Sequence, residues 1–177
     1  ASVNRGASVI TASGGAEALL VRDEMTRAPV FRTDGVRHSQ KVVAWVNSNF
    51  DELVAAVAST TGHGRLVRVR PFASGRSLFL RLSFETGDAM GMNMCTIASE
   101  AACRLIEERT GAKLISVSGN MCVDKKPAAL NFIEGRGKTV LADVRVPARS
   151  VEDRLHTTPD AMVEACYRKN LIGSGMA

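Results

Sequence analysis

The sequence has little that would suit a membrane span, a metal site or a secreted protein. No apolar run approaches the ~20 residues that a membrane-spanning helix needs. The N-terminus shows no charged region followed by an apolar one, so we expect no signal peptide, and it lacks an initial methionine, so we expect the native start to lie upstream. The four cysteines form no CxxC pair and the three histidines stand apart, which indicates a reducing intracellular compartment and no metal site.

The composition favours a soluble globular chain that binds a small anionic molecule. Hydrophobic residues make up 45% and charged residues 23% of the 177 residues, enough for one domain or for a domain with a smaller one inserted. The net charge is +5, and the basic residues are scattered rather than clustered. This distribution favours a multiply anionic ligand over nucleic acid or a membrane surface, although an ordinary solvated surface has the same composition.

The stretch from Pro29 to Asn120 has the pattern of a self-contained α+β unit. Its apolar periodicity and turn signals predict the order β-α-β-β-α-β, a ferredoxin-like arrangement with an antiparallel four-stranded sheet and both helices on one face. The predicted strands are 29–32, 66–69, 78–85 and 113–117, with a hairpin connection at 71–76, one helix at 39–57 and a second that follows Gly87-Asp88 and ends at Thr110-Gly111.

The same patterns predict which side chains are buried. Ser39 is expected to cap the first helix, and Leu78 to Phe84 are expected to alternate with Arg81 and Ser83 across the two faces of their strand. The second helix is expected to bury Met90, Met94, Ile97, Ala101 and Leu105. Beyond this unit we expect a strand at 139–146 and helices starting near Pro147 and Pro159.

Two loops and the N-terminus contain residues suited to binding anions. The segment Asp88-Ala89-Met90-Gly91-Met92-Asn93 opens a helix, where free N–H groups and the helix dipole favour an anion, although a plain capped helix with core methionines would fit as well. It is not a GxGxxG motif, so it predicts no Rossmann fold. Ser118-Gly119-Asn120 and Asp124-Lys125-Lys126-Pro127 lie in a loop that suits a carboxylate or a developing oxyanion, or is a solvated basic turn. Ser2 to Gly6 could hold a phosphate-bearing ligand or be a frayed end.

Taken together, these segments resemble one family. The strings Ala1–Gly6, Met25–Arg27, Gly87–Asn93, Val117–Asn120, Asp124–Ala129, Glu134–Lys138 and Lys169–Ser174 occur in this order in hydroxymethylglutaryl-CoA (HMG-CoA) reductases. The resemblance covers the whole chain. It implies the NADPH-dependent reduction of HMG-CoA to mevalonate and CoA, and a dimer-based homo-oligomer that needs neither nucleic acid nor metal.

The resemblance also implies roles for individual residues. Lys125 matches the catalytic lysine, whose ammonium would stabilise the negative charge that develops on the substrate oxygen. The implied HMG-binding residues are Arg27, Ser118, Asp124 and Lys126, and the implied CoA-binding residues are Ser2, Asn4, Arg5, His156 and Lys169. The implied NADPH-binding residues are Thr61, Gly62, His63, Asp88, Ala89, Met90, Gly91, Met92 and Asn93.

The domain plan that the resemblance implies has three segments. Residues 1–28 and 118–177 belong to a larger α/β substrate-binding domain, the second segment with the lysine loop, and the NADP-binding subdomain, residues 29–117, is inserted between them. The family's catalytic glutamate is expected upstream of residue 1, and its aspartate and histidine downstream of residue 177, so residues 1–177 alone are expected to be inactive.

One loop departs from the animal members of the family. Thr61-Gly62-His63-Gly64 stands where they have Ser-Arg-Phe, so a preference for NADPH over NADH is less secure, and His63 or Arg65 is expected to replace the lost arginine. The Gly-His-Gly form resembles prokaryotic members, which are cytoplasmic and lack a membrane anchor.

Two other classes of protein stay open at this point. A basic ferredoxin-like module that binds RNA would need aromatic side chains on the sheet face, and Phe79 is the one candidate. A structural protein with decayed activity is the second, although the intact lysine segment argues against it.

Overall fold

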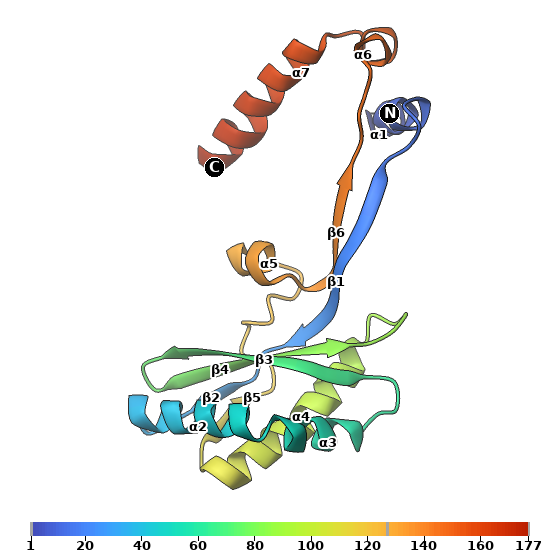
Figure 1. Cartoon of the computed structure of the whole chain (residues 1–177). Coiled ribbons are helices and arrows are strands. Elements are labelled where there is room, and N and C mark those ends of the chain that lie inside the picture. Colours follow the sequence, from blue (N-terminus) through green and yellow to red (C-terminus); the bar gives the residue numbers. More distant parts are fainter. Residues whose placement is uncertain (1, 127, 177) are drawn as a thin grey trace. The chain divides into compact units, whose positions relative to one another are not determined.

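A computed structural model describes residues 2–126 and 128–176 and divides the chain into two compact units (Figure 1). The middle unit is Leu20–Thr139, and the terminal unit combines Ala1–Leu19 with Val140–Ala177. The middle unit is therefore one continuous segment, inserted in the sequence between the two segments of the terminal unit. The boundaries between the substrate-binding and NADP-binding domains, between residues 28 and 29 and between residues 117 and 118, stay a prediction.

An antiparallel sheet forms the centre of the middle unit. Its strands are β1 (Glu17–Arg27), β2 (Val30–Arg32), β3 (Arg65–Ser74), β4 (Ser77–Glu85) and β5 (Lys113–Ser116). Strands β2 and β1 pair in succession along one edge of β4, β3 pairs along its other edge, and β5 pairs with β2, all antiparallel. The expected mixed fold with an antiparallel sheet is confirmed.

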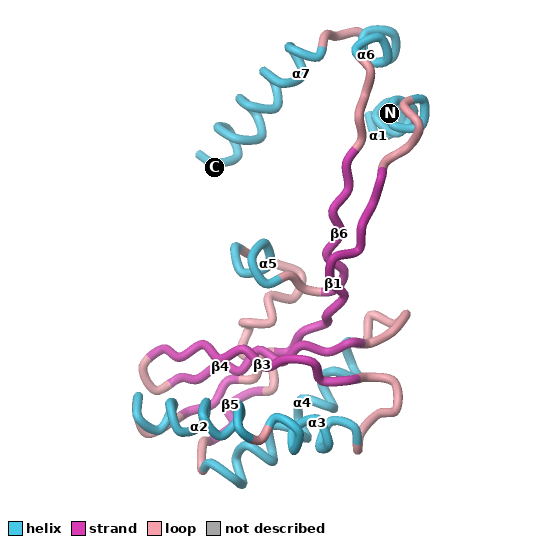
Figure 2. Tube along the Cα trace, in the orientation of Figure 1, coloured by secondary structure: helices cyan, strands magenta, loops and turns pink. Residues whose placement is uncertain are grey.

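Helices α2 (Val36–Ser48), α3 (Phe50–Ala58) and α4 (Met92–Thr110) lie on the same side of strands β2 to β5 (Figures 1 and 2). The core between these layers contains fully buried side chains from the helices and from strands β2 and β4, among them Phe31, Val42, Leu53, Leu80 and Ile106. Each such side chain stabilises the fold by about 1.5–3 kcal/mol.

The single helix expected at residues 39–57 is two helices, which is a correction. The break lies at Asn49, whose side-chain amide donates to Trp45 O at 2.8 Å and so ends α2. Ser39 is not a cap. It is buried inside α2, where its hydroxyl is 2.8 Å from the Thr33 hydroxyl, and the helix begins after Gly35.

The set of residues expected to be buried on α4 was wrong: the buried residues lie about one position later in the sequence. Ile97 is 58% exposed, and Met90 lies before the helix with 66% of its surface exposed, while Met94, Ala101 and Leu105 are half-buried. The buried side is built mainly from small residues: Cys95, Ala98, Ser99, Ala102, Cys103 and Ile106. Small side chains let α3 and α4 pack closely, and a search for large apolar residues misses such a face.

The β3–β4 hairpin is longer than predicted. Pro71 lies within β3 opposite Leu80, and the chain turns only at Gly75 and Arg76. A proline is tolerated there because β3 pairs only with β4 among the described strands, so the missing N–H faces away from the ladder.

Strand β4 is buried on both faces, which simple alternation did not indicate. Arg81 and Ser83 are 1% and 2% exposed, although they point away from the leucine face. The cover on this side comes from the end of α5 (Ala129–Glu134) and the residues after it, since Arg81 Nη2 donates to Gly135 O at 2.7 Å.

The terminal unit contains mostly helices. They are α1 (Ser2–Ala12), α6 (Ala148–Leu155), α7 (Pro159–Cys166), the π-helix η1 (Tyr167–Gly173) and α8 (Ser174–Met176). Helices α6 and α7 begin where their prolines predicted, and Thr158 Oγ1 caps α7 by accepting from Ala161 N at 3.2 Å. Helix α1 packs against α6, and the expected strand at 139–146 is β6 (Gly137–Asp143), slightly earlier in the chain, paired with β1. Among the described residues, no helix is long and apolar enough to span a membrane.

Candidate functional site

The lysine loop, residues 118–126, follows β5 and is anchored on the ends of β1 and β2. Gly119 N donates to Ala28 O at 2.7 Å, and Thr26 Oγ1 donates to Cys122 O at 3.3 Å. A Cβ atom on Gly119 would come within 2.7 Å of Val30 Cβ and 3.0 Å of the Phe79 ring. Only glycine therefore allows the loop to lie this close to the sheet. The loop backbone lies against the Phe79 ring, which is half-buried, so this ring is not a fully open platform for a base.

The loop holds an unusual backbone conformation. Asn120, Val123 and Lys125 have φ values of 67°, 49° and 56°. This left-handed region is unfavourable for residues with a Cβ, above all for β-branched valine, and such residues concentrate at functional sites. Lys125 and Lys126 are exposed, and neither makes an ion pair with another residue that the structure describes.

Arg27 and Ser118, two of the predicted substrate-binding residues, meet at the Cys122 thiol. Arg27 Nη1 is 4.0 Å and Ser118 Oγ is 3.4 Å from Cys122 Sγ, while Arg27 Nε donates to Thr96 Oγ1 at 2.9 Å. Burial alone would raise the pKa of the Cys122 thiol. Hydrogen bonds from the Ser118 hydroxyl, the Asp124 backbone and the Arg27 guanidinium outweigh burial and hold that pKa below its usual value.

Asp124 is linked to the predicted dinucleotide segment through Arg136. Arg136 Nη2 lies 3.1 Å from Asp124 Oδ1 and 3.1 Å from Met92 Sδ, and its side chain is 14% exposed. The structure thus brings Arg27, Ser118, Asp124 and the start of α4 into one region of the middle unit. Arg136 and Cys122 were missed as site residues. An arginine close after the lysine segment, within an Arg136-Gly137-Lys138 run, was the available signal.

Residues 134–136 are held by arginines from three strands. Glu134, 6% exposed at its side chain, pairs with Arg68 and Arg70 at 3.0 Å each, and Arg22 Nη1 donates to Glu134 O at 2.6 Å. Arg68 also pairs with Glu24 at 2.9 Å. Burial lowers the pKa of Arg81, whereas for Arg68 the bonds to Glu24 and Glu134 outweigh burial and raise the pKa.

The two segments predicted to bind a dinucleotide converge on Met94. A Cβ atom on Gly64 would lie 2.8 Å from Met94 Cε, and one on Gly91 would lie 3.2 Å from the same atom. Gly91 is the N-cap of α4 and has no side chain that could accept a hydrogen bond from the first N–H groups of the helix. Glycine at this position therefore leaves those N–H groups to other acceptors, such as a ligand. Thr61 Oγ1 accepts from His63 N at 3.1 Å, which shapes the neighbouring loop.

A cavity of about 300 Å³ lies beside the helix start. It is lined by Asp23, Met25, Thr86, Asp88, Ala89, Met90, Gly137 and Lys138. Asp23 and Lys138 form an ion pair in this lining. Three of the nine predicted dinucleotide-binding residues therefore face one hollow.

The predicted CoA-binding residues all lie in the terminal unit, but not in one group. Asn4 and Arg5 are exposed on α1, and His156 ends α6, the helix against which α1 packs. His156 has a φ of 56°, and its N–H donates to Glu152 O at 3.1 Å. Lys169 lies on η1, which packs against α7 and α8. The Ser2 side chain lies outside the described part of the chain.

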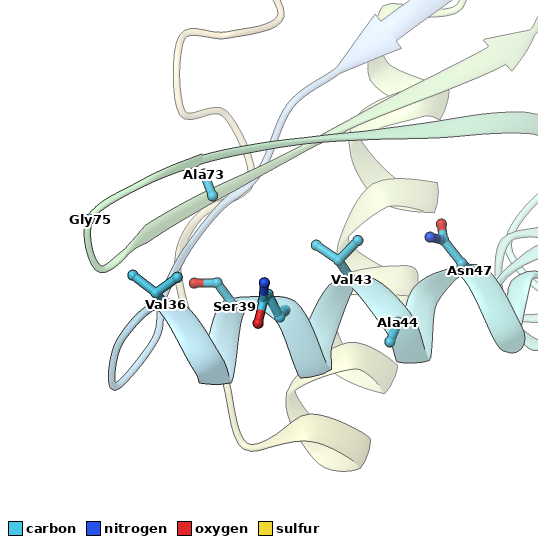
Figure 3. A pocket seen from close by; sticks show the side chains of 8 residues that line it. Val36, Ser39, Val43, Ala44, Asn47, Ala73 and Gly75 are labelled. Atoms are coloured by element: carbon cyan, nitrogen blue, oxygen red, sulfur yellow. The ribbon is translucent and has the colours of Figure 1, made fainter.

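A further cavity, of about 530 Å³, lies between α2 and the β3–β4 hairpin (Figure 3). Val36, Val43 and Ala44 on the helix and Ala73 and Gly75 on the hairpin line it. It contains none of the predicted site residues. Among residues 2–126 and 128–176, no cluster of three or more His, Cys, Asp or Glu side chains could hold a metal ion.

This fold is found in a known class of enzyme. The class II 3-hydroxy-3-methylglutaryl-CoA reductase from Streptococcus pneumoniae, bound to NADPH in open conformations, matches with a TM-score of 0.65 and 18% identity, over 89% of this chain and 40% of that one. At this identity the likeness shows a shared fold.

Sequence comparisons identify the family. The profile of the hydroxymethylglutaryl-coenzyme A reductase family matches residues 1–177. The 3-hydroxy-3-methylglutaryl-coenzyme A reductase of Haloferax volcanii is 54% identical over 177 residues, which are 100% of this chain and 44% of that protein. The corresponding figures for Halobacterium salinarum are 56%, 100% and 44%, and those for Xenopus laevis are 43%, 100% and 20%. The chain belongs to the HMG-CoA reductase family, as its motifs predicted, and spans less than half the length of these relatives.

Proposed function

We propose that this chain acts in an HMG-CoA reductase that uses NADPH to convert HMG-CoA to mevalonate and CoA. The observation that carries the proposal is the lysine loop. In this loop Lys125 directly follows Asp124, whose carboxylate pairs with Arg136, and comes three residues after Cys122, which contacts Arg27 and Ser118. The alternative of an RNA-binding module has no support, since the family is that of an enzyme and Phe79 is half-buried beside the lysine loop.

The chemistry requires negative charge to be stabilised on the substrate oxygen. The Lys125 ammonium is suited to this task because it is exposed and has no ion-pair partner among the described residues. Removing one such donor typically costs ~3–4 kcal/mol of transition-state stabilisation. Arg27 and Lys126 carry the positive charge, and Ser118 the hydroxyl donor, that a carboxylate of the HMG group would need. Asp124 would accept a hydrogen bond from a hydroxyl of the same group.

The residues around the start of α4 fit a dinucleotide. Gly64 and Gly91 both lack the Cβ that would fill the space beside Met94, and the N-terminus of α4 offers N–H groups to a phosphate. When bound, NADPH supplies hydride to the substrate carbonyl carbon. We assign Thr61, Gly62 and His63 together with residues 88–93 to holding it, with His63 or Arg65 near its 2′-phosphate.

The proposed NADP-binding subdomain, residues 29–117, is ferredoxin-like. Two observations support this assignment: the element order β2-α2/α3-β3-β4-α4-β5 and the strand order β5-β2-β4-β3. The segments 1–28 and 118–177 are then parts of the substrate-binding domain. Asn4, Arg5 and His156 would hold CoA together with Ser2 and Lys169.

The terminal unit supports a homodimer. Val163, Tyr167 and Leu171 are 69%, 51% and 66% exposed and are spaced four residues apart along α7 and η1. A row of exposed apolar residues on one helical side is typical of a surface that is covered by the rest of a longer chain or by another subunit. We also propose that the enzyme is cytoplasmic. Like the proposed activity, this proposal is taken from its relatives.

The experiment replaces Lys125 in a full-length reductase that carries this sequence. Lys125→Ala is expected to lower kcat by about 10²–10³-fold, while NADPH binding, measured by its fluorescence, stays the same. Lys41→Ala, which removes an exposed lysine on α2, is the matched control and should leave kcat unchanged. Mevalonate production that survives Lys125→Ala would contradict the assigned role, and a wild-type protein without HMG-CoA-dependent NADPH oxidation would contradict the function.

A further inference from the structure

Arg136 touches both halves of the proposed site with a single nitrogen. Its Nη2 lies 3.1 Å from Asp124 Oδ1 in the lysine loop and 3.1 Å from Met92 Sδ, the first residue of α4. The side chains of Arg136 and Asp124 are 14% and 30% exposed, so the ion pair is partly shielded from water. Asp124 directly precedes Lys125, so a fixed Asp124 carboxylate restricts where the Lys125 backbone can lie.

The segment that presents Arg136 is fixed to the sheet on several sides. Glu134 pairs with Arg68 and Arg70 of β3. The carbonyl oxygens of Glu134 and Gly135 accept from Arg22 of β1 and Arg81 of β4. Gly135 has a φ of 69°, and a Cβ there would lie 2.6 Å from Thr139 Oγ1, so the chain turns at a position suited only to glycine. The backbone that carries Arg136 is therefore attached to the sheet by several contacts.

The lysine loop needs such support because its own conformation is unfavourable. Asn120, Val123 and Lys125 all have positive φ values, and within the loop the described backbone bond is Val123 N to Asn120 O at 3.1 Å. Residues held in this region persist only when surrounding contacts fix them. Asp124, which pairs with Arg136, is the residue between Val123 and Lys125, so this ion pair can restrict the backbone of both.

We propose that Arg136 is a positioning residue: it holds Asp124, and through it Lys125, at a fixed place relative to Met92 at the start of α4. The part of the proposal that concerns catalysis rests on the proposed reductase function. The part that concerns loop order does not, and the two can be measured separately.

The first measurement is hydrogen–deuterium exchange of the lysine loop in the full-length protein without ligands. Arg136→Gln keeps much of the side chain but loses the charge, and exchange of the peptide containing Val123 is expected to become about tenfold faster or more. Arg104→Gln removes an exposed arginine whose pair with Glu100 lies within α4, and should leave the loop unchanged. Equal loop exchange in wild type and Arg136→Gln would overturn the proposal.

The second measurement is steady-state kinetics, with active sites counted by NADPH-binding stoichiometry. Arg136→Gln is expected to lower kcat per site by about 10²-fold, since small displacements of a catalytic group have effects of this size, and to change the NADPH dissociation constant less than threefold. Arg136→Lys keeps the positive charge on a single ammonium donor, and its kcat per site should lie between those of the wild type and Arg136→Gln. Asp124→Asn combined with Arg136→Gln should lower kcat per site by much less than the product of the single effects.

The outcomes separate the alternatives. A purely structural role would lower the number of NADPH-binding sites and leave kcat per site unchanged, which overturns the proposal, as do independent effects in the double variant. If Arg136→Gln does not fold, Arg136→Lys decides by the same two measurements. A wild-type protein that binds NADPH but does not oxidise it with HMG-CoA would refute the reductase function, while the exchange result would still decide whether Arg136 orders the loop.

Discussion

Gly91 and Thr86 lie so close together that a Cβ atom on Gly91 would come within 2.5 Å of Thr86 Cγ2. Thr86 cannot easily move away, because its hydroxyl donates to Ala89 O at 2.5 Å. Gly91 also has a φ of 72°, which a residue with a Cβ adopts only at a cost. The start of α4, where the dinucleotide is proposed to bind, therefore depends on glycine for two separate reasons.

Gly91→Ala should destabilise the protein by about 2–4 kcal/mol, from the clash and the backbone conformation together, and raise the KM for NADPH. Gly111→Ala at the other end of α4 is the matched control, since its φ is also 72° but no atom lies within 4 Å of the new Cβ. That variant should lose only about 1 kcal/mol. Urea unfolding gives both values, and equal losses would show that the contact with Thr86 is not important.

The second prediction concerns the choice between NADPH and NADH. Gly62 stands where an arginine is expected, and the exposed His63 is the neighbouring group that could face a 2′-phosphate. His63→Ala should therefore lower the ratio of kcat/KM for NADPH over that for NADH. Arg65→Ala is the comparison, because Arg65 pairs with Glu85 at 2.7 Å and is less free to bind a phosphate. An undiminished, strong NADPH preference after His63→Ala would refute the role of His63.

Strands β2 to β6 and most helix ends could be predicted because local chemistry determines them, but β1 was not predicted. Thr158 and Pro159 start α7, and Gly111 ends α4 with an N–H bond to Glu107 O at 2.9 Å. The break at Asn49 could not be predicted, because apolar spacing continues through it from Val46 to Leu53. Helix α1 was not predicted either, since most of its residues are Gly, Ser, Asn or the β-branched Val, Ile and Thr, which are weak helix formers.

The candidate site was predicted only as far as family motifs reach. The placement of Arg27, Ser118 and Asp124 in one region agrees with their expected common role, but periodicity alone did not link Arg27 to a loop more than 90 residues later. Arg81 and Glu134 looked like ordinary surface charges, and their burial depends on contacts between distant parts of the sequence. Such contacts are fixed by the tertiary fold and not by local pattern.

The third prediction concerns Glu134. Glu134→Gln would leave Arg70, whose side chain is 53% exposed, without a carboxylate, and Arg68, whose side chain is 30% exposed, with Glu24 alone. Breaking a fully buried pair by removing one partner costs about 3–5 kcal/mol, but water reaches both arginines and Arg68 keeps Glu24, so we expect a smaller loss of about 1–2 kcal/mol. Glu100→Gln removes the partner of the exposed Arg104 and should cost less than about 0.5 kcal/mol. Similar losses in the two variants would mean that the Glu134 cluster is effectively solvated.

The last prediction concerns stability at alkaline pH. Burial in the core raises the pKa of the Cys95 thiol to about 11, with Arg27 and Arg136 opposing part of that effect. A group whose pKa is higher in the folded than in the unfolded state favours folding while both states are protonated, and this contribution disappears as the pH rises through the folded pKa. The stability of the wild type relative to Cys95→Ala should therefore be constant up to about pH 8 and then fall by about 2–3 kcal/mol by pH 11. Burial also raises the pKa of Cys103, so Cys103→Ala should show a difference of the same sign. Urea unfolding under reducing conditions at several pH values measures these differences, and a difference that does not vary with pH would show that the Cys95 thiolate is solvated in the folded protein.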